Sequence, residues 1–137
     1  MITEDFCSYD VAKLLKEKGF DEPCKVWYSE YTSQFGSEKY TSIEFDDHNR
    51  FKKGYKFLFY APTHQMAMKW LRKEHNILLF LLPAQENGKL VYLVEVWTWN
   101  EEEGIYESSY VPIPRKEPEQ AVESALKHCL KNIKTKI

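Results

Sequence analysis

Two histidines, His64 and His75, stand in the segment APTHQMAMKWLRKEHN beside cationic and aromatic side chains, and such a segment could hold a metal or a catalytic site. The two residues are eleven positions apart. On an α-helix this spacing separates them by about 16 Å along the axis, because each residue adds 1.5 Å. They cannot share a metal ion, and the four-residue spacing of zinc proteases is absent. We predict no metal site and no cofactor, and we interpret both histidines as helix-end residues.

The same segment has the pattern of an amphipathic helix that runs from His64 to about His75. Pro62 disfavours helix at the residue before it, and Asn76 can take the left-handed conformation that ends a helix. At 100° per residue, the cationic side chains gather opposite the apolar side. This cationic face consists of Lys69, Arg72 and Lys73.

Contact with phosphates is one hypothesis for the cationic face, and Lys52 and Lys53 would extend it. The whole chain offers no cationic field, since 19 basic and 21 acidic residues give a formal charge of -2. A face of this kind is usually only solvated, and the charge balance disfavours nucleic acid as a partner. Only five glycines are present and no phosphate-cradling motif occurs. A nucleic-acid or nucleotide binder that uses these cations is the second hypothesis.

Three cysteines, Cys7, Cys24 and Cys129, are the remaining side chains with chemistry of their own. An odd number without C-x-x-C spacing suggests neither a disulfide framework nor a zinc ribbon, so we interpret them as reduced thiols. Cys7 lies near a helix start, where a thiolate is favoured. Cys129 and His128 are neighbours on a helix and point about 100° apart, so they form no dyad. A small enzyme with a Cys/His or carboxylate site is the third hypothesis, and we favour the absence of enzymatic activity.

We predict that the chain forms one domain and that it is cytoplasmic. Its first residues, MITEDFCSYD, lack the basic and apolar regions of a signal peptide. No apolar run approaches the roughly 18 residues that a membrane helix requires, so no membrane association is expected. The length of 137 residues suits a single domain over residues 1–137.

Helices and aromatic-rich strands alternate along the chain and must position these side chains. Amphipathic helices are predicted over residues 9–18, 64–75 and 118–131. Strands are predicted over residues 24–31, 40–45, 55–60, 77–83, 90–99 and 105–111. Asn87-Gly88 favours a type I′ hairpin between two of them. We expect an α+β fold in which three amphipathic helices pack on one antiparallel sheet of five to six strands, built as a meander of hairpins.

Aromatic residues make up 15% of the chain and must fill a core or anchor an interface. Alternation along the strand puts Trp97 and Trp99 on one face, and Val94 and Val96 on the other. An exposed tryptophan face would be a partner site. We expect it to be buried instead, because the domain must bury its aromatics somewhere.

Three segments, DFCSYDVAKLLKEKGFDEPC, APTHQMAMKWLRKEHNI and PEQAVESALKHCLKNI, resemble an uncharacterised family of small proteins from gut-bacterial phages, prophages and mobile elements. The resemblance implies a mobile-element accessory protein that binds a host or phage component. Our first hypothesis is therefore a non-enzymatic protein-binding module, with self-association into a homo-oligomer as an option. The residues expected to make contacts are Trp97, Trp99, Lys69, Arg72 and Lys73.

Overall fold

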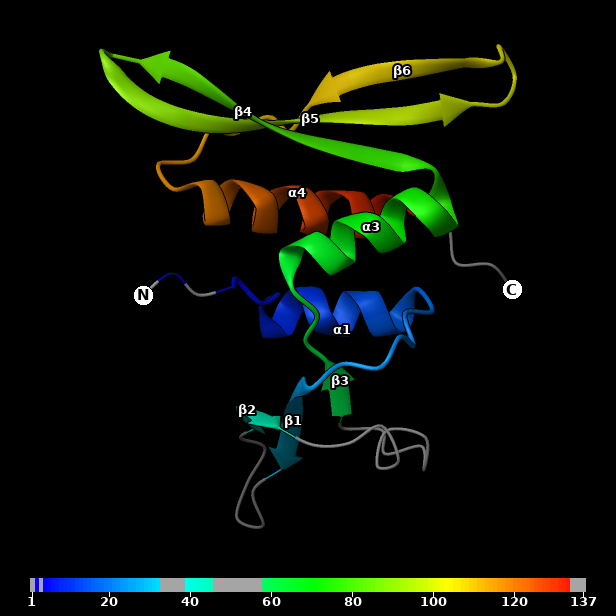
Figure 1. Cartoon of the computed structure of the whole chain (residues 1–137), viewed down its shortest axis with the longest axis vertical. Coiled ribbons are helices and arrows are strands. Elements are labelled where there is room, and N and C mark those ends of the chain that lie inside the picture. The colour runs from blue at the N-terminus through cyan, green and yellow to red at the C-terminus, as the bar shows by residue number, and fades with distance from the viewer. Residues whose placement is uncertain (1, 3, 33–38, 46–57, 134–137) are drawn as a thin grey trace. The chain divides into compact units, whose positions relative to one another are not determined.

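The computed structural model describes residues 2, 4–32, 39–45 and 58–133 (Figure 1). These ranges contain three helices and six strands, which confirms an α+β fold. Contacts between Cα atoms divide the chain into two compact units. The first comprises residues 1–63 with 134–137, and the second residues 64–133. The single domain over residues 1–137 stays a prediction.

The first unit combines one helix with a three-stranded antiparallel sheet in the order β2-β1-β3. The central strand β1 pairs with both of its neighbours. Residues 55–57 of the predicted third strand lie outside the described residues. The elements are α1 (Tyr9–Glu17), β1 (Val26–Thr32), β2 (Lys39–Phe45) and β3 (Leu58–Tyr60).

Helix α1 begins where the sequence predicts and ends at Glu17, one residue before the predicted end. The Ser8 hydroxyl accepts a hydrogen bond from the Val11 amide at 3.3 Å, which satisfies a donor of the first turn. Gly19 follows the helix with φ +98, a conformation that glycine adopts at little cost. The helix buries Val11, Ala12 and Leu15.

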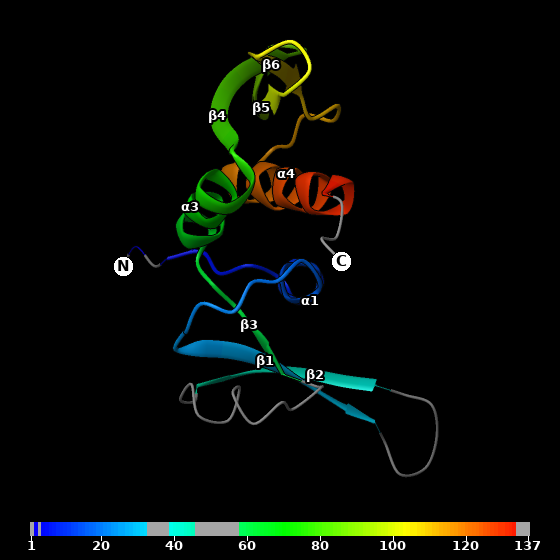
Figure 2. The same cartoon turned by 90° about the vertical axis from the view of Figure 1, so that its right-hand side faces the viewer.

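The second unit contains two helices and a three-stranded antiparallel sheet in the order β4-β5-β6. The central strand β5 pairs with β4 and β6. Figures 1 and 2 show both helices of this unit on the same side of its sheet. The elements are α3 (His64–His75), β4 (Ile77–Glu86), β5 (Lys89–Asn100), β6 (Ile105–Tyr110) and α4 (Pro118–Asn132).

Turn residues of the second unit confirm the local predictions. Asn76 follows α3 with φ 53, and Asn87 and Gly88 have φ 53 and 75, as a type I′ hairpin requires. Strand β4 continues past Pro83, where the predicted strand ended. A proline lacks the amide donor, and an edge strand such as β4 tolerates it because one side of its backbone stays unpaired.

The prediction of one sheet of five to six strands is wrong. The six strands form two sheets of three, and the helices are divided between them, with α1 contacting β3 while α3 and α4 contact β4. Strand β3 pairs with β1, helix α3 follows at once, and β4 then pairs with β5 in a new hairpin. Residue patterns predict strands and hairpins, but not whether separate hairpins join at their edges.

The core of the second unit lies between its sheet and its two helices. Leu79 of β4, and Val94 and Val96 of β5, are buried on the sheet face that meets α3 and α4. The helices contribute buried apolar side chains at helical spacing. These side chains are Ala67, Trp70, Leu71, Ala121, Ala125, Leu126, Cys129 and Leu130.

Leu126→Ala is expected to destabilise the protein by about 2 to 5 kcal/mol, because Leu126 is fully buried and truncation removes apolar contacts and leaves a cavity. The loss is measured by urea denaturation followed by circular dichroism. Lys131→Ala, at an exposed position of the same helix, is the control and should change the stability by less than about 0.5 kcal/mol. Equal effects of the two variants would contradict the packing described for α4.

Candidate functional site

The second sheet has two different faces, because side chains alternate along each strand. Leu79, Val94 and Val96 point to the face that α3 and α4 cover. The strand pairing places a second set of side chains on the opposite face. We call this set the aromatic face, and it comprises Leu78, Phe80, Leu82, Glu95, Trp97, Trp99, Tyr106 and Tyr110.

The aromatic face is open to solvent within the second unit. Phe80 is 45% exposed, Trp99 42%, Tyr106 45% and Tyr110 58%, and Trp97 is half-buried. The expectation of a buried tryptophan face is therefore wrong, because both helices of the unit pack on the valine side of β5 instead. Large exposed apolar groups that adjoin one another mark interaction sites.

Contacts hold two of the exposed rings, Trp99 and Tyr106, in place. Trp99 and Tyr106 are direct partners across β5 and β6, and their ring centroids lie 4.9 Å apart at an interplanar angle of 64°. Edge-to-face pairs of this kind contribute about 0.5 to 1.5 kcal/mol beyond the burial of their area. The Tyr106 hydroxyl also donates a hydrogen bond to Asn76 Oδ1 at 2.9 Å. Rings that are already ordered lose less entropy when a partner binds.

Part of the aromatic face is hollowed. The hollow has a volume of about 590 Å³, within the range of about 300 to 1,000 Å³ that is usual for ligand pockets. Glu95 is the one charged group in its lining, and the Trp97 indole Nε1 donates a hydrogen bond to Glu95 Oε1. The side chains that line the hollow are Leu78, Phe80, Leu82, Glu95, Trp97 and Tyr106.

The structure does not unite the predicted contact residues in one site. Trp97 and Trp99 share the aromatic face, whereas Lys69, Arg72 and Lys73 are exposed on α3, which packs on the other side of the sheet. Lys52 and Lys53 lie outside the described residues. The hollow was not predicted from the sequence, although Glu95 and Trp97 are two positions apart and so share a strand face.

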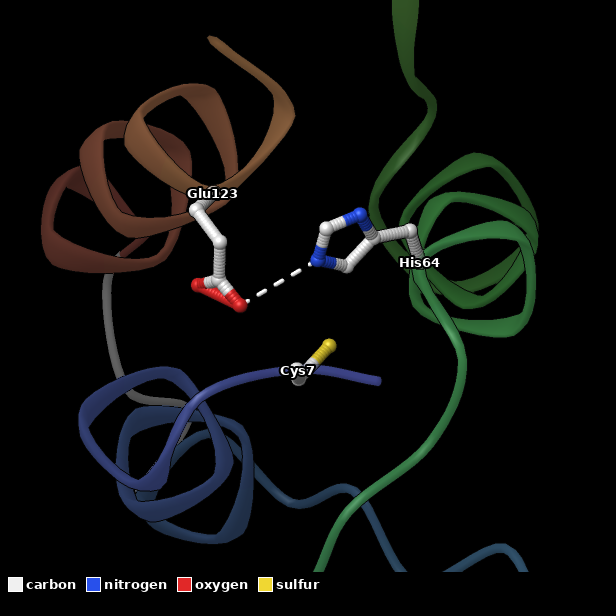
Figure 3. Close-up of side chains that lie close together, drawn as sticks. All are labelled: Cys7, His64 and Glu123. Carbon is white, nitrogen blue, oxygen red and sulfur yellow. Dashed lines mark hydrogen bonds and ion pairs between the residues drawn. The ribbon is translucent and has the colours of Figure 1, made fainter. Parts of the chain in front are cut away.

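His64 is the first residue of α3, as the sequence predicts, but it is only 8% exposed. Its Nε2 lies 3.2 Å from Glu123 Oε1 of α4, as the dashed line in Figure 3 shows. A carboxylate that holds a histidine is found in catalytic sites and also as a structural tie. This pair shares no residue with the hollow, and we interpret it as a tie between α3 and α4. No local pattern could have paired residues 59 positions apart.

None of the three cysteines forms a disulfide, and the surroundings of two of them favour the protonated thiol. Burial, with the Glu22 carboxylate as a smaller cause, raises the pKa of Cys24 to about 12. Burial raises the pKa of Cys129 to about 11. Cys7 is fully buried. A cysteine nucleophile needs a thiolate that is accessible near neutral pH, so these surroundings disfavour such a role for Cys24 and Cys129.

Comparison of the chain with protein-family models, curated proteins and solved structures finds no match. Among the helices that the structure describes, none combines the length and the apolar character needed to cross a bilayer.

Alkylation of Cys129 by iodoacetamide at pH 8 is expected to be roughly a hundredfold slower in the folded protein than in the urea-unfolded chain. The thiolate attacks the reagent and displaces iodide, and raising the pKa from 9.0 to about 11 lowers the thiolate fraction by this factor. Mass spectrometry of the peptide that contains Cys129 follows the reaction. Because burial raises the pKa, the rate should climb as the pH approaches 11. Equal rates in the folded and unfolded chains at pH 8 would contradict the assignment.

The interaction free energy between His64 of α3 and Glu123 of α4 can be measured by a double-mutant cycle. His64→Ala and Glu123→Ala are each expected to destabilise the protein, and their coupling free energy should be about 1 kcal/mol, as for a hydrogen bond between partly buried groups. Urea denaturation at pH 7 measures it. Combining His64→Ala with Lys131→Ala is the control cycle and should give additive effects. Additive effects in the first cycle would show that the two side chains do not stabilise one another.

Proposed function

We propose that this protein is a non-enzymatic protein-binding module that contacts its partner through the aromatic face of the β4-β5-β6 sheet. The observation that carries the proposal is the set of exposed, ordered rings around a hollow on the sheet face opposite α3 and α4. Tryptophan and tyrosine are enriched among the residues that dominate binding energy in protein interfaces. The surroundings of Cys24 and Cys129 disfavour a cysteine nucleophile at these two positions, because burial raises the pKa of both thiols.

Charge favours a protein over a nucleic acid as the partner. Binders of single strands place aromatic rings and cations along the same groove, so that bases stack while phosphates are neutralised. Here the hollow holds Glu95, whereas Lys69, Arg72 and Lys73 lie on α3. A carboxylate among the rings repels phosphate. The nucleic-acid hypothesis therefore requires the cationic face to act without the rings.

A host or phage component is the kind of partner that we propose, and the cytoplasm is the proposed location. The first part rests on the resemblance to the small proteins of phages and mobile elements described above. The proposed location rests on the three cysteine thiols, none of which forms a disulfide, as suits a reducing compartment. A second copy of the chain is the alternative partner for the same face.

Trp99→Ala and Tyr110→Ala are each expected to weaken partner binding by about thirtyfold, or about 2 kcal/mol, as truncation of a central aromatic residue does in protein interfaces. The tagged protein is used to capture its partner from cells that carry the gene, and the affinity of the purified pair is then measured. Both residues are exposed, so the variants should fold as the parent does. Circular dichroism checks this.

Arg72→Ala and Lys73→Ala, on the cationic face of α3, are the matched controls and should leave the affinity within about twofold. Loss of binding in these controls, with binding kept in Trp99→Ala and Tyr110→Ala, would overturn the assignment to the aromatic face. Sedimentation of the free protein tests the second copy as partner. If the free protein is a dimer and Trp99→Ala dissociates it, the partner of the aromatic face is a second copy of the chain and not a foreign protein.

A further inference from the structure

The hollow of the aromatic face contains a charged group in apolar surroundings. Five of the six lining residues, Leu78, Phe80, Leu82, Trp97 and Tyr106, present hydrocarbon or aromatic rings. The sixth is Glu95, which is half-buried on the central strand and lies directly across from Phe80 on β4 and Tyr110 on β6. The carboxylate therefore stands in the middle of the sheet rather than at its rim.

A partner that covers the hollow removes this carboxylate from water and must compensate its charge. Glu95 Oε1 accepts a hydrogen bond from the Trp97 indole. A carboxylate can accept about four hydrogen bonds in all, and removing it from water without a counter-charge is costly. A purely apolar partner would bury the charge without compensating it. A cation would compensate it, and the rings of Phe80, Trp97 and Tyr106 would add to the attraction, because the face of an aromatic ring is electronegative.

A second copy of the chain and an anionic ligand fit the hollow less well than a cation does. In a symmetric dimer formed through this face, the Glu95 of each copy would be covered by the apolar side chains of the other, and two carboxylates would lose water. A phosphate or another anion would be repelled by Glu95. An organic cation with an apolar stem remains, and the side chains of lysine and arginine have this form.

We propose that the hollow receives a lysine or arginine side chain carried by an apolar segment of the partner protein. This inference deepens the proposed function and rests on it. The cationic head pairs with Glu95, and the methylene stem packs among Leu78, Phe80 and Leu82. The volume of about 590 Å³ exceeds that of one side chain, so apolar neighbours of the basic residue share the hollow.

The inference is tested on the hollow with three six-carbon probes, n-hexylammonium, 1-hexanol and hexanoate, which differ in the charge of the head. The Trp97 indole N–H, one of four tryptophan indole signals in a ¹⁵N-labelled sample, reports binding and is assigned with Trp97→Phe. In the wild type, n-hexylammonium should bind about fivefold more tightly than 1-hexanol, and hexanoate should bind most weakly. In Glu95→Gln, which keeps the size and an oxygen acceptor, most of the preference for the ammonium over the alcohol should be lost, because only the rings still attract the cation.

Glu86→Gln is the control, because Glu86 is an exposed carboxylate at the end of β4 and outside the hollow. It should keep the fivefold preference, which separates pairing with Glu95 from the general charge of the protein. The inference is overturned if the wild type binds n-hexylammonium and 1-hexanol equally, or if Glu95→Gln keeps the fivefold preference for n-hexylammonium. It is also overturned if no probe shifts the Trp97 indole signal at millimolar concentration. Equal binding of both probes would leave the proposed protein-binding function standing. Capture that survives Trp99→Ala and Tyr110→Ala would instead remove that function, whatever the probes show.

Discussion

The second unit depends on one constraint, which is that a three-stranded sheet presents two faces while its two helices both pack on one of them. Every strand residue is committed to a face by the alternation of side chains. The covered face receives the compact side chains of Leu79, Val94 and Val96, and the other face receives most of the rings. Full burial of one ring, at 150 to 250 Å² and about 25 cal/mol per Å², would contribute roughly 4 to 6 kcal/mol. The fold leaves much of this free energy unused, and a partner can recover part of it.

The geometry of the aromatic face is set by the hairpin at Asn87 and Gly88. With positive φ at both positions, the turn fixes the register in which Phe80 opposes Glu95 and Leu78 opposes Trp97. A slip of β5 by one residue against β4 would turn Glu95 and Trp97 to the helix side. Contacts from outside the hairpin then secure the sheet. Tyr106 bonds to Asn76 at the end of α3, and His64 and Glu123 connect that helix to α4.

Local patterns in the sequence predicted the elements, because these depend on neighbouring residues. Helix α1 begins at Tyr9, Asn76 ends α3, and Asn87 begins the hairpin turn, all as expected. The division into two sheets and the choice of the valine face for the helices depend on packing between distant residues, which periodicity does not contain. The hollow was predictable in part. Glu95 is a charged residue within a run of apolar strand residues, and it shares a strand face with Trp97, two positions away. This departure from the apolar pattern is visible in the sequence alone.

Glu95 also affects whether the exposed rings associate non-specifically with other proteins. Sheets with free edges and apolar faces invite aggregation, and proteins oppose it with charges and prolines at such places. Pro83 on the edge strand β4 meets this need, since it offers no amide donor to an incoming strand. A charge that served only against aggregation would work equally well anywhere on the face. Glu95 instead stands inside the hollow and accepts the Trp97 indole N–H, which fixes both groups. Under the proposed function, its position fits selection among partners, because a carboxylate there opposes apolar and anionic partners and favours a cationic one.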